Sequence, residues 1–327
     1  MANDIRHIYI KNFKSLKECY IDDCRRINLF IGRPNVGKSN IIEALSLFTI
    51  PSLKENSSKK LSNLVRIEHE TELFYNGNWE NETLIQTDIG DCKIEFDPKE
   101  VLRIFLNING GSYSAKIDDK LNVSALSTKT DFKTTIKRYT YKADVTYKKG
   151  HSKYLIPPFG SNLLSIIENY PKLKSQVIDF FNDYSLEIAF DKSSQTIKIL
   201  QRNNEGIFLI PYNSIADTLQ RIIFYKAAIE SNNDSILLFE EPEAHSFPPY
   251  MTHLTQEMIY KKDCQFFIAT HSSFILNDFL ENAQDELAVF NVDYSEGQTV
   301  VRQLSRSELH EVLQNGVDLF TNNETYL

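Results

Sequence analysis

One segment near the N-terminus limits the possible folds of this chain more than any other. Its eight residues fit the pattern G-x-x-x-x-G-K-[ST] and read Gly32-Arg33-Pro34-Asn35-Val36-Gly37-Lys38-Ser39. The apolar run 27–31 before it predicts a buried strand, and apolar residues at helical spacing follow it up to Pro51. A strand, a glycine-containing loop and a helix in this order are typical of a phosphate-binding loop.

Each position of this loop has a chemical reason. Glycine is scarce, with 11 in 327 residues, so two glycines at the required spacing are informative. They let backbone N–H groups turn onto a phosphate at a helix N-terminus, where the helix dipole favours anions. Lys38 is expected to reach the β- and γ-phosphates, and the Ser39 hydroxyl to bind Mg²⁺. We therefore predict a nucleotide site with Mg²⁺, and we include Asn40, directly after the motif, among its residues.

Two carboxylates follow a second apolar strand. Residues 236–239 are apolar, and Glu240 and Glu241 come next. In a site that transfers a phosphoryl group, the first acid would hold the metal through water and the second would polarise the attacking water. The alternative is an ordinary strand with a solvated acidic end, and the phosphate loop in the same chain makes it the weaker interpretation.

A histidine follows a third apolar strand. The strand is predicted over 266–269, and Thr270, His271 and Ser272 come after it. Open α/β sheets bind ligands at the carboxyl ends of their strands, so His271 and Glu241 should converge on the phosphate loop. A histidine there can contact the γ-phosphate. The predicted catalytic residues are Glu241, His271 and Lys38.

The segment 211–221 permits two interpretations. Ser214 can cap a helix over 214–231, with Asp217 three residues later in a capping-box arrangement. Alternatively, the exposed N-terminus of this helix is a second phosphate site, for a nucleotide held by a partner subunit. The residue pattern alone does not separate the two.

Composition excludes several classes of protein. The net charge of −8 has the wrong sign for a protein coated in nucleic-acid-binding surface. The four cysteines lack C-x-x-C spacing, so we expect reduced structural thiols. No apolar run reaches the roughly 18 to 20 residues of a membrane span, and the N-terminus lacks the apolar core of a signal peptide. We expect a soluble, cytoplasmic protein without a membrane partner.

The chain changes character twice. Residues 51–205 combine a polar linker with short β-like runs and one helix predicted over 162–184, whereas helices and strands alternate after residue 206. Lysines, Arg138 and tyrosines alternate in the middle part, which suggests contact with nucleic acid or a partner protein; the alternative is a solvated strand face. The basic residues are Lys133, Lys137, Arg138, Lys142, Lys148, Lys149 and Lys153.

The order of these motifs resembles that of ABC-type ATPase heads, most closely the RecF/SMC-like and OLD-like (overcoming-lysogenisation-defect) bacterial ATPases. The similar segments are residues 10–15, 32–40, 214–221, 238–245 and 270–272. The resemblance implies an α/β P-loop NTPase fold, with an ABC-type ATPase head at 1–50 and 206–327 split by a β-rich α+β insertion at 51–205. It also implies ATP and Mg²⁺ as ligands and a homodimer that encloses ATP. The signature Ser214, Ala216 and Asp217 would then act on the partner's nucleotide, and Lys14 would lie near its own.

Some residues depart from the family pattern. Glu240 stands where the family usually has Asp, and residues 214–217 read Ser-Ile-Ala-Asp where transporter ATPases carry Ser-Gly-Gly-Gln. Gln86 is only a weak candidate for the family's metal-sensing glutamine. A GTPase is an alternative because the segment 128–131 mimics a guanine-specificity motif. The chain lacks a buried strand and a D-x-x-G switch before this segment, so the GTPase interpretation is the weaker one. A transporter subunit is a second alternative, but it would need the glycine-rich signature, which residues 214–217 lack, and a partner in the membrane.

The length of the chain bears on the expected function. An OLD-type nuclease would carry a further Toprim domain of about 100 or more residues, whereas 56 residues follow His271. We therefore expect an ATP-driven sensor or switch for a separately encoded effector such as a nuclease or toxin, in anti-phage defence or DNA maintenance. The alternative is an ATP-binding scaffold with little hydrolysis that holds an effector inactive.

Overall fold

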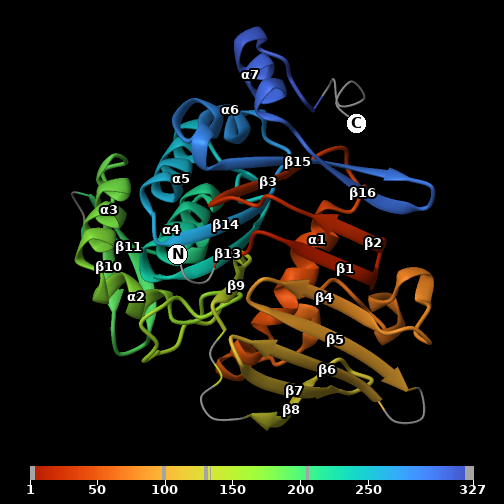
Figure 1. Cartoon of the computed structure of the whole chain (residues 1–327). Helices are drawn as coiled ribbons and strands as arrows, with labels where there is room; N and C mark the ends of the chain where they lie inside the picture. Colours follow the sequence, from red (N-terminus) through yellow and green to blue (C-terminus); the bar gives the residue numbers. More distant parts are fainter. Residues whose placement is uncertain (1–3, 98–100, 129–131, 133, 204–205, 321–327) are drawn as a thin grey trace.

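The protein is built on two large β-sheets with one helix between them, and a small third sheet lies to one side (Figure 1). The computed structural model describes residues 4–97, 101–128, 132, 134–203 and 206–320. In the described ranges, no helix has the length and apolar character needed to cross a membrane. All four cysteines are buried free thiols.

The six-stranded sheet carries the phosphate loop. Its order is β16-β15-β3-β14-β13-β9; β16 runs antiparallel to β15, and the other five strands are parallel. The strands are β3 (Ile27–Ile31), β9 (Ile136–Tyr139), β13 (Ser235–Glu240), β14 (Cys264–Ala269), β15 (Leu287–Ser295) and β16 (Gln298–Gln303). The carboxyl ends of β3, β14 and β13 therefore meet at one edge, which is where ligands bind in sheets of this kind.

The parallel sheet is covered on both faces. Phe30 packs on one face with Ile41 and Leu45 of the helix that follows the loop, whereas Leu29 and Ile31 pack on the other face with the remaining helices. Two covered faces explain why the central strands β3, β13 and β14 read as near-continuous apolar runs. The helices are α1 (Lys38–Ser46) on the first face, and α4 (Asp217–Ser231), α5 (Pro248–Tyr260) and α6 (Ser273–Asn282) on the second.

The seven-stranded sheet is antiparallel throughout and packs against the other side of α1. Its order is β2-β1-β4-β5-β6-β7-β8. The strands are β1 (Ile8–Phe13), β2 (Leu16–Ile21), β4 (Thr83–Thr87), β5 (Gly90–Asp97), β6 (Val101–Ile108), β7 (Gly111–Ile117) and β8 (Val123–Thr128). Between α1 and β4 the chain forms the short 3₁₀ segments η1 (Leu47–Glu55), η2 (Leu61–Asn63), η3 (Glu70–Leu73) and η4 (Tyr75–Gly77).

The helix predicted over 162–184 is two helices. Pro171 interrupts it, because proline offers no backbone N–H and disfavours helical geometry in the residue before it. The remaining elements are α2 (Leu163–Asn169), α3 (Pro171–Asn182), the third sheet of β10 (Glu187–Asp191), β11 (Thr196–Asn203) and β12 (Gly206–Pro211), η5 (Tyr212–Ser214), η6 (Gln284–Glu286) and α7 (Arg306–Asn315).

The division into a head at 1–50 and 206–327 and an insertion at 51–205 stays a prediction, but strand pairing crosses its boundaries. β9, from the middle part, pairs with β13 of the parallel sheet, and β4 pairs with β1. The middle part thus contributes strands to both large sheets.

Candidate functional site

The glycines of the loop between β3 and α1 hold positions that other residues cannot take. Gly32 has a φ of 143° and Gly37 one of 104°, which side-chain-bearing residues rarely adopt. A Cβ on Gly32 would lie 2.1 Å from the carbonyl oxygen of Val292, and one on Gly37 would lie 2.0 Å from Thr299 Oγ1. The loop needs glycine both for its backbone conformation and for its close approach to β15 and β16.

Lys38 is the first residue of α1 and is 5% exposed. Its Nζ donates to the carbonyl oxygens of Gly32 at 2.9 Å and Arg33 at 2.6 Å. Burial lowers the pKa of Lys38 to about 8, and the charges of Glu241 and Glu240 oppose that shift. Both carboxylates therefore lie within Coulombic reach of the amine. A phosphate at the loop would give this buried cation an anionic acceptor.

A chain of hydrogen bonds from a distant strand supports the loop. Asn40 Nδ2 donates to Ser15 Oγ at 2.7 Å, Ser15 Oγ lies 2.6 Å from Thr299 Oγ1, and Thr299 Oγ1 donates to the Val36 carbonyl oxygen at 2.8 Å. Thr299 lies on β16, and nothing in its sequence neighbourhood marks it as part of the site. Ser15 lies in the similar segment 10–15 but received no role of its own, and Thr299 was missed, because only the fold brings the two hydroxyl groups to the loop.

Glu241 and His271 lie where β13 and β14 end side by side. The N–H of Glu241, which has a φ of 43°, donates to the Ala269 carbonyl oxygen at 2.8 Å, and His271 Nε2 lies 3.7 Å from Glu241 Oε1. Burial and then the charge of Lys38 lower the pKa of His271, while the charge of Glu241 opposes the shift. The three predicted catalytic residues thus share one sheet edge, and their catalytic roles stay a prediction.

Glu243 is a further residue of this edge that received no role from the sequence. Its Oε1 accepts from Thr270 Oγ1 at 2.5 Å and from the His271 N–H at 3.0 Å. Burial raises the pKa of the Glu243 carboxyl group. This side chain connects the loop after Glu241 to the backbone at His271. The sequence feature that could have pointed to Glu243 is its position in the run Glu-Glu-Pro-Glu, two residues after Glu241.

Glu240, the predicted metal-side acid, lies between two arginines. Its Oε1 accepts from Arg66 Nη2 at 2.9 Å and its Oε2 from Arg138 Nη2 at 2.6 Å. Arg138 comes from β9, and Arg66 follows η2. Neither arginine was predicted to belong to the site, because their sequence separations from Glu240 are 102 and 174 residues and no motif links them.

The donors at this edge suit Mg²⁺ in the way nucleotide sites bind it. Mg²⁺ usually takes one or two carboxylates together with substrate phosphates and water, rather than an all-protein cage. Ser39, Glu240 and Glu241 supply a hydroxyl and carboxylates at the loop and the ends of its neighbouring strands. Among the described residues, no group of three or more His, Cys, Asp and Glu side chains could hold an ion by itself. The residues thus fit a metal that arrives with a nucleotide.

Lys14 has a φ of 51° in the turn after β1. Its Nζ pairs with Glu43 Oε2 at 2.5 Å and donates to the Arg66 carbonyl oxygen at 2.9 Å. Glu43 lies on α1 and is completely buried. Lys14 is therefore tied to the helix behind the loop, and its predicted nearness to nucleotide stays a prediction.

The signature segment differs from its sequence interpretation. Ser214 ends η5, and α4 begins at Asp217 after Ala216, which makes no side-chain cap hydrogen bond. The predicted capping box is wrong, because Asp217 itself lies in the first helical turn, where its carboxylate pairs with Arg221 at 2.6 Å. Ser214 and Ala216 are exposed. Thr218 Oγ1 donates to the His245 carbonyl oxygen at 2.6 Å and so joins α4 to the loop after Glu241.

The structure contradicts the predicted basic surface at two of its residues, whereas Lys142, Lys149 and Lys153 are exposed and their contact with a partner stays a prediction. Lys137 and Arg138 are 7% and 4% exposed, and Lys137 Nζ donates to Asn232 Oδ1 at 2.5 Å and lies 3.8 Å from the centre of the Tyr154 ring. The two side chains are part of the core around β9, so they cannot contact a nucleic acid. Gln86 is exposed on β4. Lys133 and residues 129–131 of the guanine-type motif lie outside the described residues.

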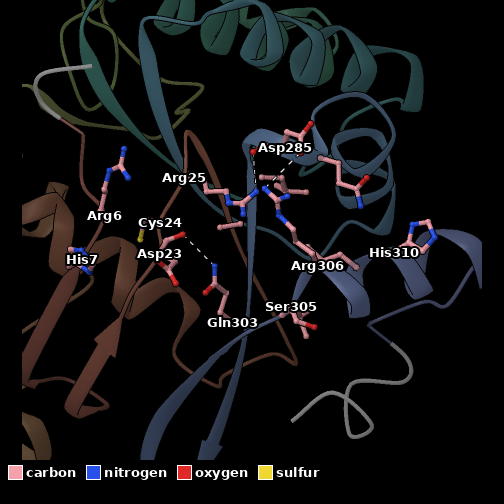
Figure 2. A pocket seen from close by; sticks show the side chains of 15 residues that line it. Arg6, His7, Asp23, Cys24, Arg25, Asp285, Gln303, Ser305, Arg306 and His310 are labelled. Carbon is pink, nitrogen blue, oxygen red and sulfur yellow. Dashed lines mark hydrogen bonds and ion pairs between the residues drawn. The ribbon is translucent and has the colours of Figure 1, made fainter.

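A cavity of about 710 Å³ lies at the opposite end of the parallel sheet (Figure 2). The residues that line it lie just before β3, at the start of β15 and at the start of α7. The cavity is therefore at the amino end of β3, whereas the phosphate loop is at the carboxyl end of that strand. Its three arginines accompany two aspartates. Arg25 Nη1 donates to the Asp285 carbonyl oxygen at 3.0 Å, and Arg306 lies 3.8 Å from the Asp285 carboxylate. Its mixed charges favour no particular ligand.

Comparison with known proteins gives one family match. The family model described as AAA ATPase domain matches residues 4–210. An uncharacterized protein of Methanocaldococcus jannaschii is 43% identical over 54 residues, which are 16% of this chain and 24% of that protein. The DNA replication and repair protein RecF of Caldanaerobacter subterraneus subsp. tengcongensis is 30% identical over 106 residues, 32% of this chain and 27% of RecF. The matches thus span about a quarter of the length of these relatives.

One solved structure extends the comparison to the whole chain. The Smc head domain with an extended coiled coil, bound to the C-terminal domain of ScpA and derived from Pyrococcus furiosus, has a TM-score of 0.50 and 13% identity. The similarity covers 95% of this chain and 98% of that one. At this identity the similarity concerns the fold alone.

Proposed function

This chain belongs to the AAA ATPase domain family and is of the RecF/SMC-like type, and we propose on that premise that it binds ATP with Mg²⁺ at residues 32–39 and hydrolyses it slowly. The observation that carries the proposal is the buried ammonium of Lys38 at the sheet edge that also holds Glu241 and His271. A buried cation inside a loop of backbone donors is suited to a polyphosphate.

Each residue has a role that its position supports. The loop N–H groups and Lys38 hold the β- and γ-phosphates, and Ser39 and Glu240 hold the metal. Mg²⁺, when bound, neutralises charge on the phosphates. Glu241 would orient and polarise the attacking water, and the His271 ring would donate a hydrogen bond to the γ-phosphate. Glu243 positions His271 through its backbone N–H.

The proposal extends to assembly. Two copies would enclose ATP, with the exposed Ser214 and Ala216 and the neighbouring Asp217 of each facing the nucleotide of the other. The Thr218 to His245 contact would connect that face to the loop after Glu241 in the same subunit. In a cytoplasmic setting, this ATP-dependent dimer would act as a switch for a separately encoded effector, such as a nuclease or toxin, in anti-phage defence or DNA maintenance. The RecF relative, named for DNA replication and repair, supports the second setting.

A second function also has a supporting observation. Both oxygens of Glu240 face guanidinium groups, and Lys38 bonds to carbonyls of its own loop. A site closed in this way suits a scaffold that binds ATP, hydrolyses little of it and holds its effector inactive.

Glu241→Gln separates the two functions. For an ATPase, this change should abolish phosphate release and trap an ATP-bound dimer, seen as a doubled mass in light scattering. For a scaffold, neither turnover nor mass should change. Glu281→Gln, at an exposed position on α6, is the matched control and should behave as wild type in both assays. Lys38→Ala should remove ATP binding under both functions, and retained binding would refute the site.

A further inference from the structure

Five charged side chains from separate parts of the chain meet beside the loop, and we name them the charge cluster. They are Lys14, Glu43, Arg66, Arg138 and Glu240. Glu43 Oε2 pairs with Lys14 Nζ at 2.5 Å, and Glu43 Oε1 accepts from Arg66 Nε at 2.9 Å. Arg66 and Arg138 then share the Glu240 carboxylate. The charge cluster holds three cations and two carboxylates, so one positive charge is in excess.

The two arginines on Glu240 are held differently. The Arg138 side chain is 5% exposed, and its Nη1 also donates to the Leu64 carbonyl oxygen. The Arg66 side chain is 64% exposed and reaches Glu240 through one nitrogen. Its backbone N–H donates to Glu43 Oε1, so the Arg66 backbone stays in place when the planar guanidinium, which carries both Nε and Nη2, moves away from Glu240. The Arg66 to Glu240 bond can open toward solvent, whereas moving Arg138 would leave buried charges unpaired.

A divalent cation at Glu240 would add two positive charges to a cluster that already has one in excess. Each Glu240 oxygen already faces a guanidinium group, and like charges at such short range repel strongly outside bulk water. We propose that Arg66 and the divalent cation compete for Glu240 Oε1. Arg66 covers this oxygen in the nucleotide-free protein and leaves it when metal and nucleotide bind, while Arg138 remains. The inference rests on the proposed function, because it takes Glu240 as the metal-side acid of a nucleotide site.

The test measures metal binding instead of turnover. Arg66→Gln removes the competing charge and keeps a hydrogen-bonding amide. Mn²⁺ replaces Mg²⁺ as the probe, because the free ion gives an electron paramagnetic resonance signal that disappears on binding. Titrations use the full chain with a non-hydrolysable ATP analogue at the same concentration as the protein, and a titration of the analogue alone gives the Mn²⁺ that free nucleotide binds. We expect Arg66→Gln to bind Mn²⁺ about two- to fivefold more tightly than wild type, the factor that corresponds to an exposed ion pair.

Two further variants make the result specific. Arg66→Lys keeps the positive charge and should bind Mn²⁺ as wild type does. Arg202→Gln removes an exposed ion pair with Glu187 in the third sheet and should also leave the affinity unchanged. Circular dichroism checks that each variant is folded. Unchanged or weaker Mn²⁺ binding by Arg66→Gln overturns the inference about Arg66. If wild type still binds nucleotide in that case, the proposed function stands. Absence of nucleotide binding in wild type would overturn both.

Discussion

Glu43 offers a direct test of the ion pairs behind the loop. It is a completely buried carboxylate on α1 that accepts from Lys14 Nζ at 2.5 Å, from Arg66 Nε at 2.9 Å and from the Arg66 backbone N–H at 3.2 Å. Glu43→Gln keeps the shape of the side chain and removes its charge. The Lys14 ammonium, in a side chain that is 15% exposed, then loses its carboxylate partner.

The size of the effect follows from the exposure of the two partners. Removing one member of a buried ion pair costs about 3 to 5 kcal/mol. Lys14 keeps its bond to the Arg66 carbonyl oxygen and some contact with water, which places its share at the lower end. The mostly exposed Arg66 adds less than about 1 kcal/mol. We expect a loss of about 3 kcal/mol, which at about 2 °C per kcal/mol for a chain of this size lowers Tm by about 6 °C.

Thermal unfolding followed by circular dichroism measures this loss. Lys14→Met and the double variant complete a double-mutant cycle, in which the two changes should cost less together than the sum of their separate effects, by about 1 kcal/mol or more. Glu82→Gln, which removes an exposed partner of Lys93, is the control and should shift Tm by no more than about 2 °C. A Tm within about 2 °C of wild type for Glu43→Gln, or additive effects in the cycle, would refute the reasoning.

Three further predictions concern the loop. Gly32→Ala places a Cβ 2.1 Å from a backbone oxygen at a φ of 143° and should abolish ATP binding in calorimetry. The control Gly77→Ala, at a φ of 69° in open space, should bind ATP normally. ATP binding by Gly32→Ala would contradict the close approach of the loop to β15. ATP affinity should fall above pH 8, by up to about tenfold per pH unit, because only the charged Lys38 holds phosphate. The pKa of Lys38 is about 8 in the folded protein, below its ordinary value of 10.5, so the unfolded chain binds more protons between these two values. The free energy of unfolding should therefore rise with pH across that window. A flat affinity from pH 7 to 9 would count against a buried lysine.

The parts of the site that the sequence predicted well share a physical basis. The loop lies between β3 and α1 because glycine conformation, strand period and helix period all act over a few residues. Glu241 and His271 could be placed at the same edge because parallel strands bring their carboxyl ends together. The helix over 162–184 and the capping box at Ser214 were wrong in detail, because Pro171 and the start of α4 at Asp217 decide the local helix boundaries.

The sequence by itself determined where a phosphate can bind and which strands end beside it, since those features depend on short-range spacing. Only the tertiary structure decided which charges surround that place. Arg66, Arg138 and Thr299 reach the site from elements far away in the chain, and two residues of the expected basic surface, Lys137 and Arg138, lie in the core. The physical reason is that a charged side chain carries no local sign of its partner: packing of the two sheets around α1 places Glu43 and Glu240 where these cations must meet them.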